Sequence, residues 1–422
     1  MFGFANFLLL ALFAAAVFDL IFALARGGGL RGALHGLWNT PHLLFGQQLA
    51  EWRLQLGRIL FAAGLAAYEI SVVFCNSMAR QNWAWVQGVM SPVLEWLAFL
   101  CFGAKILFGT RYTWRELLAG GALYFNSQNI WWIGIVVAVL AAKDVPLRRP
   151  LQVYFASGCA AMAVVLALHF AGIVAPDLTS ERMGALRGTY GYGHPNTFGG
   201  LVFGLVLAYA LLRAQKVRWV DCLLVFAVGV FLLVGPASRS AALCTLALAV
   251  GLVFCRLRAG HSVPRWWPGT CAGMVGLTAA VSYLLPLLVI KVGPWNNDIG
   301  PAWLAKLDSL LTCRISLTWM AYRLLDVKIA GQVFNWPTVD NSFAFALFQF
   351  GPVVAALLGI LFAAALWGHA KQGRRVEVCC LFAMLAYAYM EVQPFHLTTN
   401  PTALLLCGAV FAQASARWQK IE

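Results

Sequence analysis

The residues able to do chemistry gather in four polar clusters that lie between long apolar runs. They are Arg187 to Asn196, which contains Tyr190 and His194; Ser238-Arg239-Ser240; Arg314 with the later Asp340 and Asn341; and Glu391, Gln393, His396 and Asn400. Ionisable residues inside or beside a membrane are energetically costly, so a functional role is the first hypothesis for them.

Three arginines, Arg187, Arg239 and Arg314, point to a polyanionic ligand. Guanidinium binds phosphate through paired hydrogen bonds and stays charged when partly buried. The sequence contains no pair of acidic residues that suggests a bound metal. We therefore expect the arginines to neutralise a phosphate or pyrophosphate themselves.

Three further residues, His194, Asp340 and Glu391, are able to accept a proton from an attacking hydroxyl group. Together with the arginines they fit a lipid-linked pyrophosphate donor, whose lipid lies in the bilayer and whose sugars lie outside it.

Each cluster also has a purely structural interpretation. Arg187 is also explained as an interfacial arginine that extends toward water. The glycines between Arg187 and His194 are also explained by a turn, and His194 by a helix cap. Asp340-Asn341-Ser342 has the residue types of a helix N-cap.

The elements that must position these residues are membrane-spanning helices. Apolar types make up 61% of the 422 residues and charged types 11%, and the mean hydropathy is +0.77. This composition excludes an ordinary soluble enzyme and a disordered chain. Long continuous apolar runs favour α-helical spans over a β-barrel.

The apolar runs predict an all-α polytopic membrane protein with about 12–13 transmembrane helices, forming a single transmembrane domain over 1–422. The twelve predicted spans are 4–25, 55–75, 84–109, 116–141, 151–175, 197–213, 218–235, 239–256, 270–290, 342–366, 376–392 and 399–416. Two long connections remain, an outer-face motif loop at 175–196 and a long outer-face loop at 291–341. No internal repeat is visible, which disfavours an inverted-repeat transporter.

The net charge of +14 is explained by loops that collect Lys and Arg on the cytoplasmic side. Basic loops that alternate regularly after residue 213 predict a cytoplasmic C-terminus, with all four polar clusters at the outer ends of spans. No nucleic-acid partner is indicated. The 116–141 run has basic residues on both flanks, so it is either one span or two short segments whose basic ends are both inside.

Several motifs resemble those of capsular and exopolysaccharide polymerases of the Wzy type, in the O-antigen polymerase and ligase superfamily. Residues 187–199, RGTYGYGHPNTFG, are similar to that family's GFGHPNxLG stretch, and Ser238-Arg239-Ser240 to its SR(S/T). Residues 310–315, LLTCRI, resemble its LLTGR(I/T), with Cys313 in place of the usual Gly. Residues 339–343, VDNSF, resemble its DNSY. The order, spacing and topology agree over roughly residues 55–415.

The resemblance implies a GT-C-type helical bundle in the bacterial plasma membrane, with its active site facing the periplasm or exterior. It implies a metal-independent glycosyltransferase without a cofactor, which polymerises undecaprenyl-pyrophosphate-linked oligosaccharide repeat units into O-antigen, capsule or exopolysaccharide. Such units serve as both donor and acceptor, and a chain-length regulator and a flippase are possible protein partners.

Under this hypothesis Arg187, Arg239 and Arg314 bind the pyrophosphate, and His194, Asp340 or Glu391 is catalytic and orients or deprotonates the acceptor hydroxyl. The residues Tyr190, Asn196 and Asn341 shape the site or bind sugar.

Two alternatives stay open. The related O-antigen ligases, which move glycan to a lipid or protein acceptor, usually carry His before the Asn where this chain has Asp340; that departure favours a polymerase. A transporter or flippase of lipid-linked sugars should carry charges along a through-path, whereas these clusters gather at one membrane face.

Overall fold

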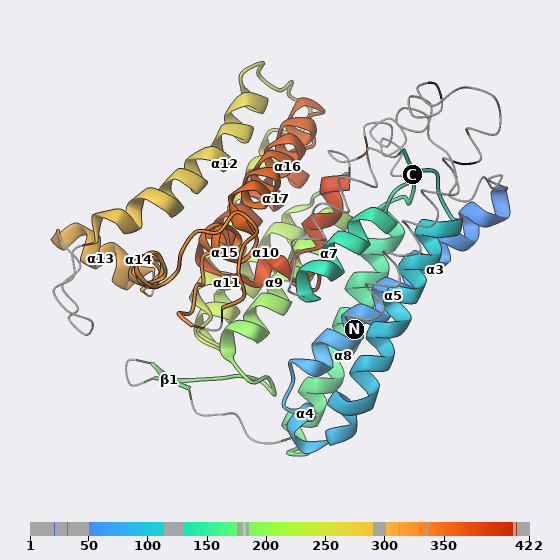
Figure 1. Ribbon diagram of the computed structural model, residues 1–422, viewed down its shortest axis with the longest axis horizontal. Helices are drawn as coiled ribbons and strands as arrows, with labels where there is room; N and C mark the ends of the chain where they lie inside the picture. Colours follow the sequence, from blue (N-terminus) through green and yellow to red (C-terminus); the bar gives the residue numbers. More distant parts are fainter. Residues whose placement is uncertain are drawn as a thin grey trace. The chain divides into compact units, whose positions relative to one another are not determined.

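The computed structural model is helical (Figure 1). It describes residues 21, 32, 50–113, 130–174, 180–182, 185–289, 301–311, 313–334, 336–407 and 411. Within these residues seven helical segments are long and apolar enough to cross a membrane: Glu51–Cys75, Val86–Phe108, Arg148–Phe170, Pro195–Leu212, Arg239–Leu257, Trp267–Leu288 and Gly351–Lys371. The prediction of an all-α polytopic membrane protein is confirmed, so the protein associates with a lipid bilayer.

The chain divides into two units. Unit 1 comprises residues 1–178, 190–193 and 410–422, and unit 2 comprises residues 179–189 and 194–409. Each unit contains apolar helices of spanning length. The single transmembrane domain expected from the sequence stays a prediction.

Unit 1 is built around α3, which packs against both α5 and α8. Its elements are α3 (Glu51–Cys75), α4 (Ala79–Asn82), the π-helical η2 (Val86–Met90), α5 (Ser91–Phe108), α7 (Ile130–Ala141) and α8 (Arg148–Phe170). Gly64 allows the close approach of α3 and α5, because a Cβ there would lie 2.9 Å from Phe102. The predicted span 4–25 lies outside the described residues, apart from Ile21.

The two flanks of the predicted 116–141 span lie together in unit 1. The Tyr112 hydroxyl donates to the Leu140 carbonyl at 2.8 Å, and Thr110 donates to the Asp144 carboxylate. Residues 114–129 lie outside the described part. Because both flanks meet, the chain enters and leaves this segment at the same end of the unit.

Unit 2 contains the remaining elements. They are β1 (Ser180–Arg182), β2 (Ala185–Arg187), α9 (Pro195–Leu212), α10 (Trp219–Val234), α11 (Arg239–Leu257), α12 (Trp267–Leu284), η3 (Leu285–Leu288), α13 (Ala302–Leu310), α14 (Arg314–Leu324), α15 (Ser342–Gln349), α16 (Gly351–Lys371), α17 (Arg375–Met390), η4 (Gln393–Phe395) and η5 (Pro401–Leu406). The strands β1 and β2 form a short antiparallel hairpin.

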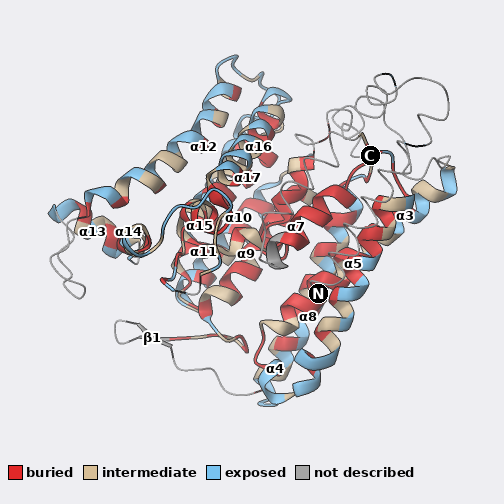
Figure 2. Cartoon of the chain, viewed as in Figure 1, coloured by how far each residue is buried: buried red, intermediate tan, exposed pale blue. Residues whose placement is uncertain are grey.

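Helix α9 lies inside unit 2, and α12 lies at its margin. Of the most apolar stretch of α9, 67% is buried, against 22% for α12, and Figure 2 shows the same contrast along the two ribbons. Around α9, α11 packs against α9, α10 and α17. A helix that faces lipid is expected to expose apolar side chains, since lipid replaces protein contacts there.

Two predicted spans differ from the structure. The predicted 342–366 span is broken into α15 and α16, because Gly351 has a left-handed φ of +82° and Pro352 begins the next helix. The described beginning of the predicted 399–416 span forms the 3-10 helix η5, which also begins at a proline, Pro401. Apolar composition alone does not register these backbone features.

Candidate functional site

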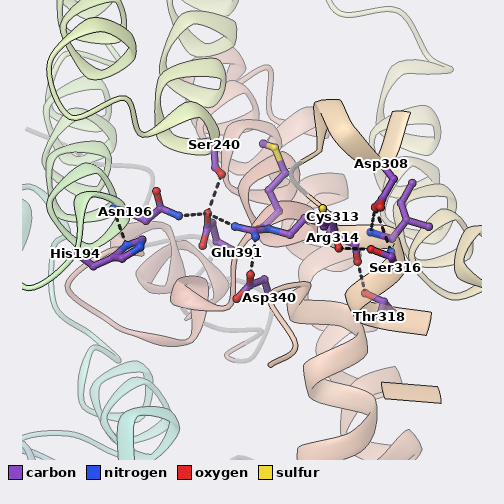
Figure 3. Close-up of polar contacts among 12 residues, drawn as sticks. His194, Asn196, Ser240, Asp308, Cys313, Arg314, Ser316, Thr318, Asp340 and Glu391 are labelled. Carbon is purple, nitrogen blue, oxygen red and sulfur yellow. Dashed lines mark hydrogen bonds and ion pairs between the residues drawn. The ribbon is translucent and has the colours of Figure 1, made fainter. Parts of the chain in front are cut away.

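The carboxylate of Glu391 is the centre of a polar network in unit 2 (Figure 3). Its Oε1 accepts hydrogen bonds from Ser240 Oγ at 2.7 Å, Arg314 Nη2 at 2.9 Å and Asn196 Nδ2 at 3.1 Å. No described hydrogen bond or ion pair reaches its other oxygen, Oε2. Glu391 is only 4% exposed, so this charged group lies in the interior of the unit.

Arg314 lies between two carboxylates. Its Nη1 is 2.6 Å from Asp340 Oδ2 and its Nη2 is 2.9 Å from Glu391 Oε1. Its Nε donates to the Met390 carbonyl at 2.7 Å. The guanidinium is therefore fixed on three sides, and one positive charge is shared by two negative ones.

The start of α14 presents Arg314 to this network. Asp308, in the preceding α13, accepts hydrogen bonds at Oδ1 from the backbone N–H groups of Ile315 and Ser316, at 2.8 and 3.1 Å. It thereby caps the first turn of α14. Cys313 has a left-handed φ of +66° immediately before the helix. Glycine adopts this conformation at the least cost, and glycine is the residue of the resembling motif at this position.

A second arginine joins the network through Asn196. Arg187, 8% exposed, donates from Nη2 to Asn196 Oδ1 at 2.9 Å and to the Ala237 carbonyl at 3.2 Å. The Asn196 side chain therefore links Arg187 to Glu391. Arg187 is therefore buried and hydrogen-bonded to protein groups. It does not extend toward water, as the interpretation as an interfacial arginine would require.

Two glycines in the RGTYGYGHPNTFGG stretch let α9 approach its neighbours. A Cβ at Gly199 would lie 2.3 Å from Ser238 Oγ, and one at Gly200 would lie 1.9 Å from Gln393 Oε1. Gln393 in turn donates from Nε2 to the Asn196 carbonyl at 3.2 Å. The glycines thus hold the start of α9 against the segments that carry Ser238 and Gln393.

Two of the predicted residues have cap roles. His194 is the N-cap of α9, and its Nδ1 accepts from the Asn196 N–H at 3.1 Å. Asn341 caps α15 through Oδ1 and donates from Nδ2 to Ser282 Oγ at 3.1 Å. For Asn341 the cap and this bond account for both polar atoms of the side chain.

The other predicted residues are placed differently. Arg239 occupies the first position of α11, half-buried between Ser238 and Ser240. Tyr190 belongs to unit 1, whereas the network belongs to unit 2.

Burial sets the proton affinity of the site. Burial raises the pKa of Glu391 above its usual range, and the Arg314 charge and the Ser240 hydrogen bond oppose that rise. Burial lowers the pKa of His396, in the loop after η4, to about 4. His396 is therefore neutral at physiological pH.

Three supporting residues were not among the predicted site residues. Asp308 caps the helix that starts at Arg314, Ser342 Oγ donates to the Glu391 carbonyl at 2.5 Å, and Gln393 joins α9 to η4. The signal for Asp308 was a lone acid six residues before an arginine motif, which no local pattern distinguishes from a surface acid. In the part of the chain that the structure describes, no group of three or more His, Cys, Asp or Glu side chains could hold a metal ion.

Comparisons of this chain with protein-family models, with curated proteins and with solved structures found no match. Function must therefore be argued from the site itself.

Proposed function

We propose that the protein is a membrane glycosyltransferase that polymerises undecaprenyl-pyrophosphate-linked oligosaccharide repeat units on the outer face of a bacterial plasma membrane. The observation that carries this proposal is Arg314, whose side chain is 10% exposed and is ion-paired to both Asp340 and Glu391. Glu391 and Asn196 in turn connect it to Arg187. Such a set places phosphate-binding cations next to a carboxylate able to accept a proton.

In the proposed step, an acceptor sugar hydroxyl attacks the anomeric carbon of the donor. A C–O bond forms to the acceptor oxygen, the bond between the anomeric carbon and the phosphate oxygen breaks, and its electron pair leaves with the pyrophosphate. The hydroxyl proton passes to Glu391 Oε2. Oε1 is occupied by three donors, so Oε2 is the acceptor that remains among the described contacts.

The cations act on the leaving group. Guanidinium groups stabilise the negative charge that develops on pyrophosphate as it departs. Arg187 and Arg314 supply that charge in this proposal, and Arg239 lies next to Ser240 at the start of α11. Three of the five N–H groups of Arg314 are engaged by the protein, so the other two serve the pyrophosphate without breaking both ion pairs.

The test is a reaction of purified protein with lipid-pyrophosphate-linked repeat units, followed by separation of the products on a gel. We expect a ladder of multiples of the unit, abolished by Glu391→Gln and Arg314→Gln. The matched control is Arg323→Gln, which changes an exposed arginine at the far end of α14 and should leave the ladder intact.

Two outcomes would overturn the polymerase proposal. Transfer only when a lipid-core or protein acceptor is added would identify a ligase. A normal ladder from folded Glu391→Gln protein would remove the proposed base.

A further inference from the structure

A second charged cluster lies in unit 1, outside the site described above. It consists of Arg58 on α3, Lys105 near the end of α5, and Lys143 and Asp144 after α7. Lys105 interacts electrostatically with the other three. We call these four residues the basic cluster. Among the described residues the basic cluster therefore holds three basic side chains and one carboxylate.

Two of the three basic side chains of the cluster are buried, and Arg58 is half-buried. Lys105 is 1% exposed and Lys143 is 3% exposed, and burying a charge is costly unless partners compensate it. Lys143 Nζ lies over the rings of Tyr112 and Phe411, at 5.0 and 5.2 Å from their centroids.

Neutral carbonyl groups hold the Lys105 ammonium. Lys105 Nζ donates to the carbonyls of Gly109 at 3.2 Å and of Lys143 at 3.0 Å. An ammonium has three hydrogens, and the described residues provide these two acceptors. The two printed acceptors of Lys105 Nζ are therefore neutral carbonyl oxygens.

The surrounding backbone is shaped to admit the Lys105 side chain. A Cβ at Gly57 or at Gly109 would lie 2.8 Å from Lys105 Cδ. The Cβ of Gly109 would also lie 2.9 Å from Gly57 Cα. The absence of a Cβ at these two glycines, which lie on different segments, therefore leaves room for the Lys105 side chain to reach the cluster.

The cluster also contains a buried donor that lacks an acceptor. Arg58 Nε is inaccessible to solvent and has no hydrogen-bond partner in the described part of the chain. The one carboxylate, Asp144, accepts a hydrogen bond from Thr110. A buried guanidinium N–H that is left unpaired costs free energy, so such a group needs an explanation.

We propose that Arg58, Lys105 and Lys143 form a binding site for a phosphate group. Phosphate supplies the acceptor that Arg58 Nε lacks, and its oxygens can accept further hydrogen bonds from ammonium groups such as that of Lys105. The inference is independent of the proposed transferase activity, because it concerns other residues in the other unit.

The position of Arg58 defines two sources for the phosphate. On α3 it lies between Leu56 and Ile59, which are 43% and 64% exposed, and such apolar side chains suit contact with lipid tails. The phosphate belongs either to an anionic phospholipid at the bilayer margin or to a free phosphate ion.

The experiment measures binding with purified full-length protein. Phosphatidylglycerol or phosphatidylcholine is titrated in native mass spectrometry, and thermal unfolding is compared in inorganic phosphate and in chloride at equal ionic strength. The variant is Arg58→Gln, which keeps much of the side-chain stem. The matched control is Arg149→Gln, an exposed arginine at the start of α8.

We expect Arg58→Gln to weaken one of the two interactions about tenfold, the scale of one charge-assisted hydrogen bond, while Arg149→Gln leaves it unchanged. A loss of phosphatidylglycerol binding identifies a lipid phosphate, and a loss of stabilisation by inorganic phosphate identifies the free ion.

Equal behaviour of the two variants in both assays overturns the proposal. If Arg58→Gln fails to fold, the wild-type protein decides the matter. A preference for neither phosphatidylglycerol over phosphatidylcholine nor phosphate over chloride overturns the site as well.

Discussion

At the scale of single residues, Glu391 combines features that seldom occur together. It is buried, it accepts three hydrogen bonds on one oxygen, and one of the donors is an arginine that also binds a second acid. Each donor favours the ionised form, whereas burial favours the protonated form. Burial prevails and raises the pKa.

The first prediction concerns the pH dependence of activity. A base must be ionised to accept a proton, so transfer should fall with decreasing pH, with a midpoint above the usual Glu value of about 4.3. Ser240 donates a hydrogen bond that lowers this pKa; Ser240→Ala should therefore move the midpoint to still higher pH.

The measurement is the rate of product formation between about pH 4 and 8. The matched control, Thr245→Ala, alters the next turn of α11, where Thr245 donates to its own helix. An acid limb that stays in place in Ser240→Ala would contradict the assignment of the limb to Glu391.

The second prediction concerns the stability that depends on Arg314. Replacing it with Gln leaves Asp340, whose side chain is 22% exposed, and the buried Glu391 without their shared cation. Breaking a buried ion pair such as that of Glu391 costs about 3–5 kcal/mol. We expect the thermal unfolding midpoint of Arg314→Gln to drop clearly below that of Arg323→Gln. Equal midpoints for the two variants would mean that the ion pairs contribute nothing to folding.

At the scale of elements, the network exists because helix ends meet. Asn196, Ser240 and Arg314 lie in the first turns of α9, α11 and α14, and Glu391 directly follows α17. Helix starts expose N–H groups and favour negative charge nearby. Each of the three helix starts also places a side-chain donor on the Glu391 carboxylate.

The third prediction tests the close approach of α9. Gly200→Ala would place a methyl group against Gln393 Oε1 and the Tyr387 hydroxyl, and overpacking of this kind costs typically about 1–3 kcal/mol. The matched control is Gly193→Ala, where nothing lies within 4 Å. We expect loss of activity and a lower unfolding midpoint for Gly200→Ala alone. If both variants behave as wild type, the close approach of α9 at Gly200 is not required for folding or activity.

The fourth prediction tests the cap of α14. Asp308→Ala removes the acceptor of the Ile315 and Ser316 N–H groups, and loss of a cap costs about 1–2 kcal/mol. Asp308→Asn keeps an acceptor oxygen and should retain most of the stability and activity. Thermal unfolding and the ladder assay measure both. Equal losses for Ala and Asn would show that charge, rather than the cap, matters at this position.

At the scale of the whole molecule, the sequence predicted the class of fold well because apolar runs of about 20 residues have few structural alternatives. It did not predict the break at Gly351 or the 3-10 helix at Pro401, since composition windows average over single residues.

The candidate site was predictable only in part, and the reason is again physical. The residue types of Arg187, Arg314 and Glu391 indicated their chemistry. Which side chains meet, however, depends on tertiary contacts between residues up to about two hundred positions apart in the sequence. For that reason the shared role of Arg314 and the cap by Asp308 were not inferred from the sequence.

The fifth prediction concerns the topology of unit 1. The flanks of the 116–141 segment are hydrogen-bonded to each other, so residues 111 and 149 should lie on the same side of the membrane. Alkaline phosphatase fused after Arg111 and after Arg149 should therefore report the same side. Opposite reports would contradict this prediction.

The contacts of Glu391 also have a consequence for biogenesis. A ribosome delivers Asn196, Ser240 and Arg314 to the membrane well before Glu391, the last member of the network to be synthesised. Until then the nascent chain holds a guanidinium that lacks one of its two acidic partners. A product that ends before residue 391 would lack the carboxylate that accepts from Asn196, Ser240 and Arg314.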